Sequence, residues 1–375
     1  MTTYVQYNNG SPSVSAATAD SPANFALFWE VWRIVEDQFY DGVPQDSSAT
    51  YGAIKGALAA LNDPYTIFVE PQPRALEKAE LEGQFGGIGA YVYRDEQNRV
   101  LLNPMVDSPA EKAGLQKDDV LLQVDDTPIR PEMSTDEVVL LIRGEVGTTV
   151  TLLVSRQGAA DPISLTIERA IIETPSVAWR LADEDPTIGY VQISLFSNRT
   201  SRELDRALTD LRKQGATRFI LDLRGNGGGL LEAAIDVASK FLSEGVVLTE
   251  KRRNADPTVY RVRGGYKLLY APLVVLVDGG TASASEIVAG ALQDYGRATL
   301  IGERTYGKGS VQLVYDLSDQ SSVHVTVARW FTPNNHSIDG TGIAPDIEVL
   351  FSEEDHAAGR DPQYLRAIEE LQTQP

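Results

Sequence analysis

Two residues whose side chains could do chemistry together are Ser283 and Lys308. Ser283 follows a Gly-Gly turn and stands at the start of an apolar-periodic segment, a pattern that predicts a helix entry with Thr281, Ser283 or Ser285 as its cap. A serine there lies near unpaired backbone N–H groups, which would stabilise an oxyanion. Lys308 lies between two glycines, where close packing would bury its amine. Alone, each residue has a simpler interpretation, as a helix cap or a solvated cation.

The lysine turn also suggests a different chemistry, phosphate binding. The segment GERTYGKGS, which starts at Gly302, nearly matches the phosphate-loop pattern G-x-x-x-x-G-K-[ST]. However, Gly309 occupies the position of the metal-binding hydroxyl. The segment VQLVYDL that follows alternates like a strand, whereas a phosphate loop opens a helix. We therefore do not expect a nucleotide site.

The joint pattern TASASEI followed by GKGSVQ resembles the carboxy-terminal processing peptidases, also called tail-specific proteases. Other segments resemble the same family, in the same order, along nearly the whole chain. The resemblance implies that Ser283 is the nucleophile, Lys308 the general base and Gln312 the residue that orients the lysine. One departure is Asp278, which begins the turn before the serine where the family usually has Asn.

A second motif, DLRGNGGGLL, resembles the family pattern D-L-R-x-N-x-G-G-L, with Gly227 where Pro is common. The resemblance implies an oxyanion hole formed by the backbone N–H groups of Gly228 and Ala284. Without the resemblance, the motif reads as a glycine-rich turn between a strand and a helix, or as a phosphate nest.

The stretch from 83 to 169 consists of short alternating strands and glycine turns and resembles a PDZ domain. In such a domain a peptide adds as a strand to a sheet edge, and the amides of a glycine loop receive its terminal carboxylate. The loop residues would be Gly86, Gly87, Ile88 and Gly89. A helix expected over 134–142 would form the other wall of the groove. We expect that Ile88 and this helix favour partners with free, apolar C-termini.

Composition excludes several classes of function. A formal charge of −20 argues against nucleic acid and anionic membranes as partners. The chain has no Cys, which excludes a thiol nucleophile and a zinc-thiolate site, and its three histidines have no metal-ligand spacing. We therefore predict neither metal nor cofactor. His324 alternates with valines on an expected strand, and we interpret it as structural.

The N-terminal part carries no signal that places it in a membrane. No apolar run reaches the roughly 18 residues of a bilayer span, and the start lacks the basic and apolar regions of a signal peptide. The family resemblance nevertheless implies an extracytoplasmic enzyme. Segment 25–39 predicts an amphipathic helix with an aromatic stripe. We expect this stripe to pack in the core, because Glu30, Glu36 and Asp37 disfavour a membrane surface.

The predicted fold class is α/β, in five parts within 375 residues. These are a flexible tail (1–22), an N-terminal helical segment (23–82), a PDZ-like mainly β domain (83–169), an α/β serine peptidase core (170–352) and a C-terminal helix and tail (353–375). The predicted function is a serine endopeptidase that recognises substrate C-terminal ends and cleaves with a Ser/Lys dyad. The alternative is a catalytically inactive peptide-binding scaffold. The sequence leaves monomer and homodimer open.

Overall fold

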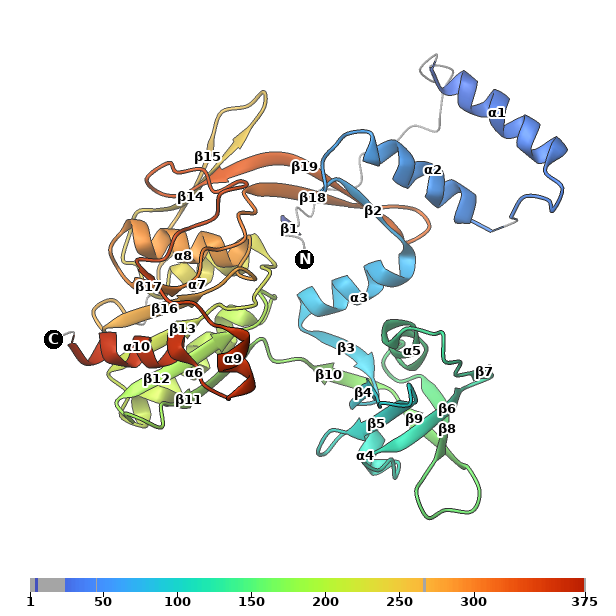
Figure 1. Cartoon of the computed structure of the whole chain (residues 1–375), viewed down its shortest axis with the longest axis horizontal. Coiled ribbons are helices and arrows are strands. Elements are labelled where there is room, and N and C mark those ends of the chain that lie inside the picture. Colours follow the sequence, from blue (N-terminus) through green and yellow to red (C-terminus); the bar gives the residue numbers. More distant parts are fainter. Residues whose placement is uncertain (1–3, 6–23, 45, 266–267, 374–375) are drawn as a thin grey trace.

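The computed structural model describes residues 4–5, 24–44, 46–265 and 268–373. Within these residues the strands form three six-stranded sheets and one two-stranded ribbon. Two of the large sheets lie together with the helices of the C-terminal half of the chain, and the third sheet forms a separate small domain (Figure 1). This arrangement confirms the predicted fold class.

The first large sheet is mostly parallel and carries the core of the molecule. Its order is β11-β12-β13-β16-β17-β20, and only the pairing of β11 with β12 is antiparallel. The strands are β11 (Val177–Leu181), β12 (Ile188–Ile193), β13 (Arg218–Asp222), β16 (Leu273–Val277), β17 (Thr299–Gly302) and β20 (Ile347–Glu348). All five residues of β16 are buried, as its continuous apolar run predicts for a strand covered on both faces.

Helices cover both faces of this parallel sheet. Because side chains alternate along a strand, Leu221 and Val275 belong to one apolar cluster, while Ile220 and Val274 belong to another. The first cluster includes residues of α6 (Thr200–Lys213), α7 (Leu231–Ala238) and α8 (Ala284–Asp294). The second includes residues of the terminal helix α10 (Pro362–Thr373), which is preceded by the short α9 (Glu353–Ala357).

The second large sheet is mostly antiparallel and supplies the lysine side of the site. Its long β18-β19 hairpin reaches from the parallel sheet toward the N-terminal helices (Figure 1). The strands are β18 (Ser310–Asp316), β19 (Ser322–Phe331), β14 (Val246–Arg252), β15 (Thr258–Arg261) and β2 (Ile67–Val69). A short strand β1 (Tyr4–Val5) also pairs with β18, inside the range expected to be a flexible tail. The rest of that range lies outside the described residues.

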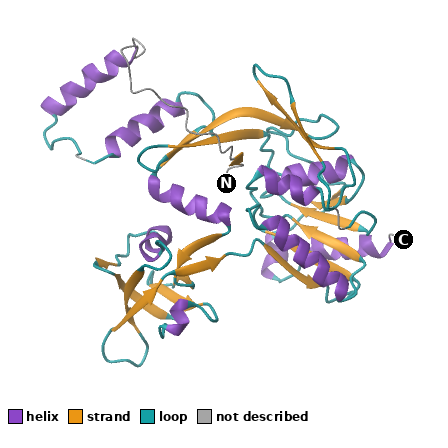
Figure 2. Ribbon diagram, turned by 180° about the vertical axis from the view of Figure 1, so that it is seen from behind, coloured by secondary structure: helices purple, strands orange, loops and turns teal. Residues whose placement is uncertain are grey.

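The third large sheet, with two short helices, forms the PDZ-like domain around its own apolar core. Its elements are β4 (Ala90–Arg94), β5 (Val100–Pro104), α4 (Pro109–Lys112), β6 (Asp119–Val124), β7 (Thr127–Pro128), α5 (Thr135–Ile142), β8 (Thr149–Ser155) and β9 (Ile163–Glu168). Two antiparallel strands, β3 (Gln84–Gly87) and β10 (Ala170–Glu173), connect this domain to the rest (Figure 2). Helix α3 (Pro71–Glu82) precedes β3.

Helix α1 (Asn24–Gln38) forms where the periodicity predicts a helix, and α2 (Ser48–Ala59) follows it within the expected helical segment. The expectation that the aromatic stripe of α1 packs in the core is wrong, because Phe25, Trp29 and Ile34 are 50–58% exposed. An amphipathic pattern fixes which face of a helix is apolar, but it does not ensure that the same chain covers that face. Across the described ranges, no helix combines the length and apolar character that crossing a bilayer requires.

Candidate active site

Ser283 stands at the junction between strand β16 and helix α8. The serine is the N-cap of α8, and its backbone adopts φ 63° and ψ −115°, a positive-φ conformation that is rare for a residue with a side chain. Such an outlier at a helix start is typical of a site where one side chain must be aimed. Its Oγ is buried and has no hydrogen-bond partner in the described part of the chain. A free hydroxyl at a helix N-terminus is available for chemistry.

Asp278 holds the turn that carries the serine. Its Oδ1 accepts hydrogen bonds from the amides of Gly225 and Gly280, both at 2.9 Å, and from the hydroxyl of Thr281 at 3.0 Å. The carboxylate therefore joins the serine turn to the glycine motif of the neighbouring strand β13. The departure from Asn at this position gives the turn an acceptor with two charged oxygens.

Lys308 lies in a turn that only glycines can form. A Cβ at Gly307 would stand 2.7 Å from the amide nitrogen of Gly342, and a Cβ at Gly309 would stand 2.7 Å from Asp339. This close packing leaves the Lys308 side chain 2% exposed. Burial lowers the pKa of Lys308 from 10.5 to about 8, although the negative charges of Asp63, Glu286 and Glu77 act in the opposite direction. A substantial fraction of the amine is therefore neutral near physiological pH.

Glu286 brings the serine and the lysine together. Its Oε2 accepts hydrogen bonds from the backbone amides of Ser283 at 2.7 Å and Lys308 at 2.9 Å. Its Oε1 accepts from the Thr305 hydroxyl at 2.5 Å and the Gly307 amide at 2.7 Å. The side chain is fully buried, and burial raises its pKa against the effect of these four donors. One carboxylate thus fixes the serine turn relative to the lysine turn.

The sequence reasoning did not single out Glu286, although a signal was present. Ser283 and Glu286 have the S-x-x-E spacing of a capping box, in which the acidic side chain binds the amide of the cap residue. The structure contains that half of the box, from the Ser283 amide to the carboxylate. The serine hydroxyl takes no part in it, which leaves that hydroxyl free.

Gly228 and Ala284, the residues predicted for an oxyanion hole, lie beside the serine. A Cβ at Gly228 would stand 2.8 Å from the Cβ of Ser283 and 3.1 Å from the Ala284 nitrogen. Gly228 also has φ 114°, so this position requires glycine. Ala284 is the first residue of α8, where an amide has no acceptor within the helix. The Gly228 amide donates to the Oδ1 of Asn226 at 2.9 Å.

The glycine motif is anchored by buried polar side chains that the sequence reasoning did not assign. The Asn226 carbonyl accepts from the Ala282 amide and the Ser285 hydroxyl, and its side-chain amide donates to the Ile193 carbonyl. Arg224 is paired with the fully buried Asp222 at 2.7 Å, and it also reaches Asp361 at the start of α10 at 2.9 Å. These bonds connect the turn beside the serine to both faces of the parallel sheet.

Gln312, on strand β18, is fully buried on the lysine side of the site. Its side-chain amide donates to the Ser310 hydroxyl at 2.8 Å and the Thr326 hydroxyl at 3.2 Å. Its Oε1 has no hydrogen-bond partner among the described residues. A buried acceptor without a donor is unusual, and the side chain is held by its amide end while its oxygen stays available.

The predicted carboxylate loop, 86–89, consists of the last two residues of β3 and the two residues before β4. The Gly86 carbonyl accepts from the Gly144 amide just beyond α5, and the Gly89 carbonyl accepts from Met105. The expectation that the Ile88 side chain contacts the end of a peptide is wrong. Ile88 is 2% exposed and belongs to the apolar core of the domain, because its side chain points inward from the loop.

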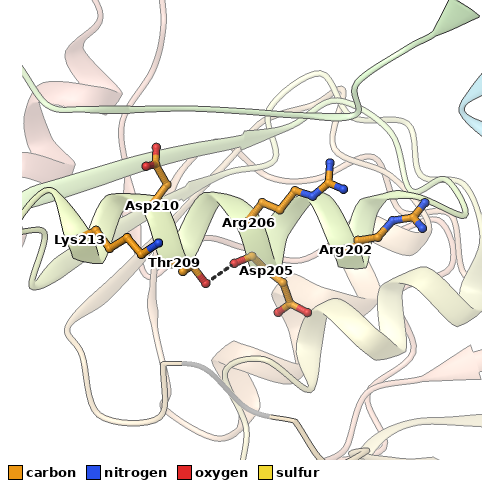
Figure 3. Close-up of a pocket in the computed structure, with 6 residues that line it drawn as sticks. All are labelled: Arg202, Asp205, Arg206, Thr209, Asp210 and Lys213. Atoms are coloured by element: carbon orange, nitrogen blue, oxygen red, sulfur yellow. Dashed lines mark hydrogen bonds between the residues drawn. The ribbon is translucent and has the colours of Figure 1, made fainter.

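Two other features do not belong to this site. His324 is fully buried on β19, where its Nε2 lies 3.1 Å from the Ser322 hydroxyl and 3.4 Å from Glu77, which agrees with a structural role. Figure 3 shows a hollow on the outer side of α6 to which no candidate site residue contributes. It is lined by Arg202, Asp205, Arg206, Thr209, Asp210 and Lys213. Within the described residues no cluster of three or more His, Asp or Glu side chains could hold a metal ion.

The strand that follows Lys308 argues against a phosphate loop. Residues 310–316 form β18, whereas a phosphate loop opens a helix whose amides hold the phosphates. The lysine turn therefore lacks the helix N-terminus that nucleotide binding needs, as expected from the alternation of the sequence.

Comparisons with known proteins agree with this geometry. Residues 187–349 match peptidase family S41, and residues 101–156 match the PDZ domain. The chain is 38% identical to a carboxyl-terminal-processing protease of Synechocystis sp., over 91% of this chain and 81% of that one. It is 36% identical to a carboxy-terminal processing protease of Bacillus subtilis, over 89% and 70%.

Among solved structures, the photosystem II D1 C-terminal processing protease matches with 34% identity and a TM-score of 0.50, over 88% of this chain and 94% of that one. These relatives are named as proteases, so the alternative of an inactive scaffold has no support. The chain belongs to the carboxyl-terminal-processing proteases of peptidase family S41, serine-type peptidases, and it carries a PDZ domain.

Proposed function

We propose that this protease cleaves peptide bonds with Ser283 as nucleophile and Lys308 as general base. The observation that carries the proposal is a lysine that is 2% exposed, with a pKa lowered to about 8, whose backbone shares one carboxylate with the backbone of the serine. A lysine can act as a base at neutral pH only when its surroundings disfavour the ammonium form.

The proposed reaction is an acyl transfer through Ser283. The neutral amine of Lys308 removes the hydroxyl proton of Ser283, and the Oγ attacks the scissile carbonyl. The amides of Gly228 and Ala284 donate to the oxyanion that develops. The Lys308 ammonium then returns its proton to the leaving amine, which departs and leaves an acyl-enzyme. Water, deprotonated by Lys308, releases the second product and restores the serine.

Gln312 would orient the base. Its side-chain amide is fixed by two hydroxyls, which leaves Oε1 as a buried acceptor without a donor. An ammonium has three N–H donors, and its charge would strengthen a bond to this oxygen. We propose that Oε1 receives the Lys308 ammonium after proton transfer.

We further propose that the PDZ domain selects substrates by their C-terminal carboxylate. Besides the amides of the loop 86–89, the mouth of this loop contains Arg143, the residue after α5. Its guanidinium lies 3.6 Å from the centre of the Phe85 ring, which directly precedes Gly86. The Nε and Nη1 atoms are buried and have no hydrogen-bond partner in the described residues. A half-buried guanidinium with two buried donors that lack acceptors fits an incoming carboxylate, since such donors otherwise cost free energy.

The preferred substrates are unfolded proteins or peptides that end in an apolar residue with a free carboxylate. The Phe85 ring and the half-buried Val139 of α5 supply the apolar surface near the loop. Because Ile88 points into the core, it does not contribute to this surface.

The test of selection is chemical. One unstructured peptide with an apolar C-terminus is compared with the same peptide amidated, and with one ending in Asp. Charge-assisted hydrogen bonds are worth about 1.5–3 kcal/mol each, so the amidated peptide should show kcat/KM lower by about tenfold or more. Arg143→Gln should reduce the difference between the free and amidated peptides. Equal rates for all three peptides would refute recognition of the tail and leave the dyad unaffected.

A further inference from the structure

The Lys308 amine is covered by a residue from a distant part of the sequence. Its Nζ lies over the ring of Tyr65, 4.6 Å from the ring centre. Tyr65 belongs to the segment Asn62-Asp63-Pro64-Tyr65-Thr66, which precedes strand β2 and the PDZ domain. A ring face at this distance attracts a cation and also keeps water away from it.

The chain around Tyr65 is built to hold the ring in place. The Asp63 carboxylate accepts from the Tyr65 amide at 3.1 Å and from the Thr66 hydroxyl at 2.6 Å. The Thr66 hydroxyl in turn accepts from the Thr326 amide of β19 at 3.1 Å, and β2 extends this contact by pairing with β19. Backbone and side chain thus fix the segment to the sheet that carries the lysine.

The same segment reaches the amide end of Gln312. Thr326, whose backbone amide donates to the Thr66 hydroxyl, accepts at its own hydroxyl from Gln312 Nε2 at 3.2 Å. Burial, followed by interaction with Tyr306 of the lysine turn, raises the pKa of Tyr65 to about 12, so the phenol stays neutral over the working range of a protease.

We propose that Tyr65 is a positioning residue for the general base: its ring closes the Lys308 amine off from water and presents a π face to the ammonium. This inference rests on the proposed role of Lys308. The two effects of the ring oppose each other. Covering the amine disfavours the ammonium form, whereas the π face favours it. The charged groups that act on the amine are Asp63 of the same segment, Glu286 of α8 and Glu77 of α3. All three favour the ammonium, so the cover supplied by Tyr65 opposes them.

Three substitutions separate the two effects. Tyr65→Phe keeps the cover and the π face, so the titration of Lys308 should not change. Tyr65→Leu keeps most of the cover without the π face, so the Lys308 pKa should fall by about half a unit. Tyr65→Ala removes both and admits water, so the pKa should rise toward the ordinary lysine value.

The titration is measured on the amine itself. Competitive acetylation with acetic anhydride over a pH series, with the Lys308 peptide quantified by mass spectrometry, gives the pKa without reference to catalysis. The matched control is Tyr51→Ala. Tyr51 packs on Phe68 of β2 with ring centres 5.0 Å apart and donates to Asp319, so it supports the same segment without touching the amine. It should leave the titration unchanged.

The pH profile of kcat/KM on an unstructured peptide completes the test. The inference is supported if the Lys308 pKa falls in Tyr65→Leu and rises in Tyr65→Ala, and if the apparent pKa at which kcat/KM rises with pH shifts in the same direction in each variant. Any other pattern of the two shifts, or an equal shift in Tyr51→Ala, overturns it. If the Lys308 pKa shifts as expected while the apparent pKa of the kcat/KM profile does not change, Lys308 is not the base and the proposed function fails instead. Should the Ala variant not fold, the Leu and Phe variants decide.

Discussion

The backbone N–H of Gly228 donates to the side-chain Oδ1 of Asn226 at 2.9 Å, so one of the two proposed oxyanion donors is already engaged. The serine next to it is fully buried, and its hydroxyl has no hydrogen-bond partner among the described residues. In the proposed mechanism a substrate oxyanion must compete with Asn226 Oδ1 for the Gly228 amide, and catalytic hydrogen bonds commonly tighten only when substrate binds.

Substitution of Gly228 tests the oxyanion hole. Gly228→Ala should lower kcat by about 10²–10³, as much as the loss of one oxyanion donor, because the new methyl would press on Ser283 at a φ of 114° and displace the Gly228 amide. The control is Gly227→Ala, one residue earlier, where φ is not positive. A steady-state assay on an unstructured peptide compares the two. Near-native kcat in Gly228→Ala would show that the site tolerates the methyl, and would contradict the requirement for glycine beside Ser283.

Glu286 should be required for activity because its carboxylate holds the serine turn and the lysine turn together. Glu286→Gln replaces one accepting oxygen with an N–H₂ group that faces donors, so we expect kcat to fall by more than 10² and the unfolding temperature to drop. The control is Glu250→Gln, a carboxylate that is 1% exposed and paired with Arg252. This change should lower stability while leaving kcat within a few fold. If both variants behaved alike, Glu286 would have no special role in the site.

The pH dependence of activity should report Lys308. Because the base must be neutral, kcat/KM should rise with pH along a limb with an apparent pKa near 8 and reach a plateau above it. At pH 7 about one tenth of the amine is neutral. A limb near 6.5, the value of an ordinary histidine, would point to another base.

The same pKa predicts an effect on stability. The folded state holds the Lys308 amine with a pKa near 8, below its unfolded value of 10.5, so below pH 8 the buried ammonium costs about 3 kcal/mol. The cost disappears as the pH rises from 8 to 10.5. Lys308→Met should therefore raise the free energy of unfolding at pH 7, with a gain that shrinks toward pH 10.5. Chemical denaturation at several pH values measures it, and a gain independent of pH would contradict the buried ammonium.

Much of this fold could be predicted because its signals are local. The apolar run of β16 indicates a buried strand, the small residues after it indicate a helix entry, and glycines on both sides of Lys308 indicate close packing. Each of these is a property of a few neighbouring residues.

What the sequence could not show depends on contacts between distant segments. The position of Tyr65 over Lys308 follows from the pairing of β2 with β19, which no periodicity encodes. Ile88 was misplaced because alternation near a glycine turn does not decide which way a side chain points. The prediction that the aromatic stripe of α1 is buried was wrong because an apolar pattern does not show which surface, if any, covers it.

The most direct test of the central claim is cleavage of an unfolded protein substrate by the wild type, Ser283→Ala and Lys308→Arg, each first shown to be folded by circular dichroism. A guanidinium stays protonated and cannot act as a base. The wild type should cleave, while both variants should lose activity by at least about 10³-fold and unfold near the wild-type temperature. Cleavage by folded Ser283→Ala, or by folded Lys308→Arg, near the wild-type rate would contradict the Ser/Lys dyad.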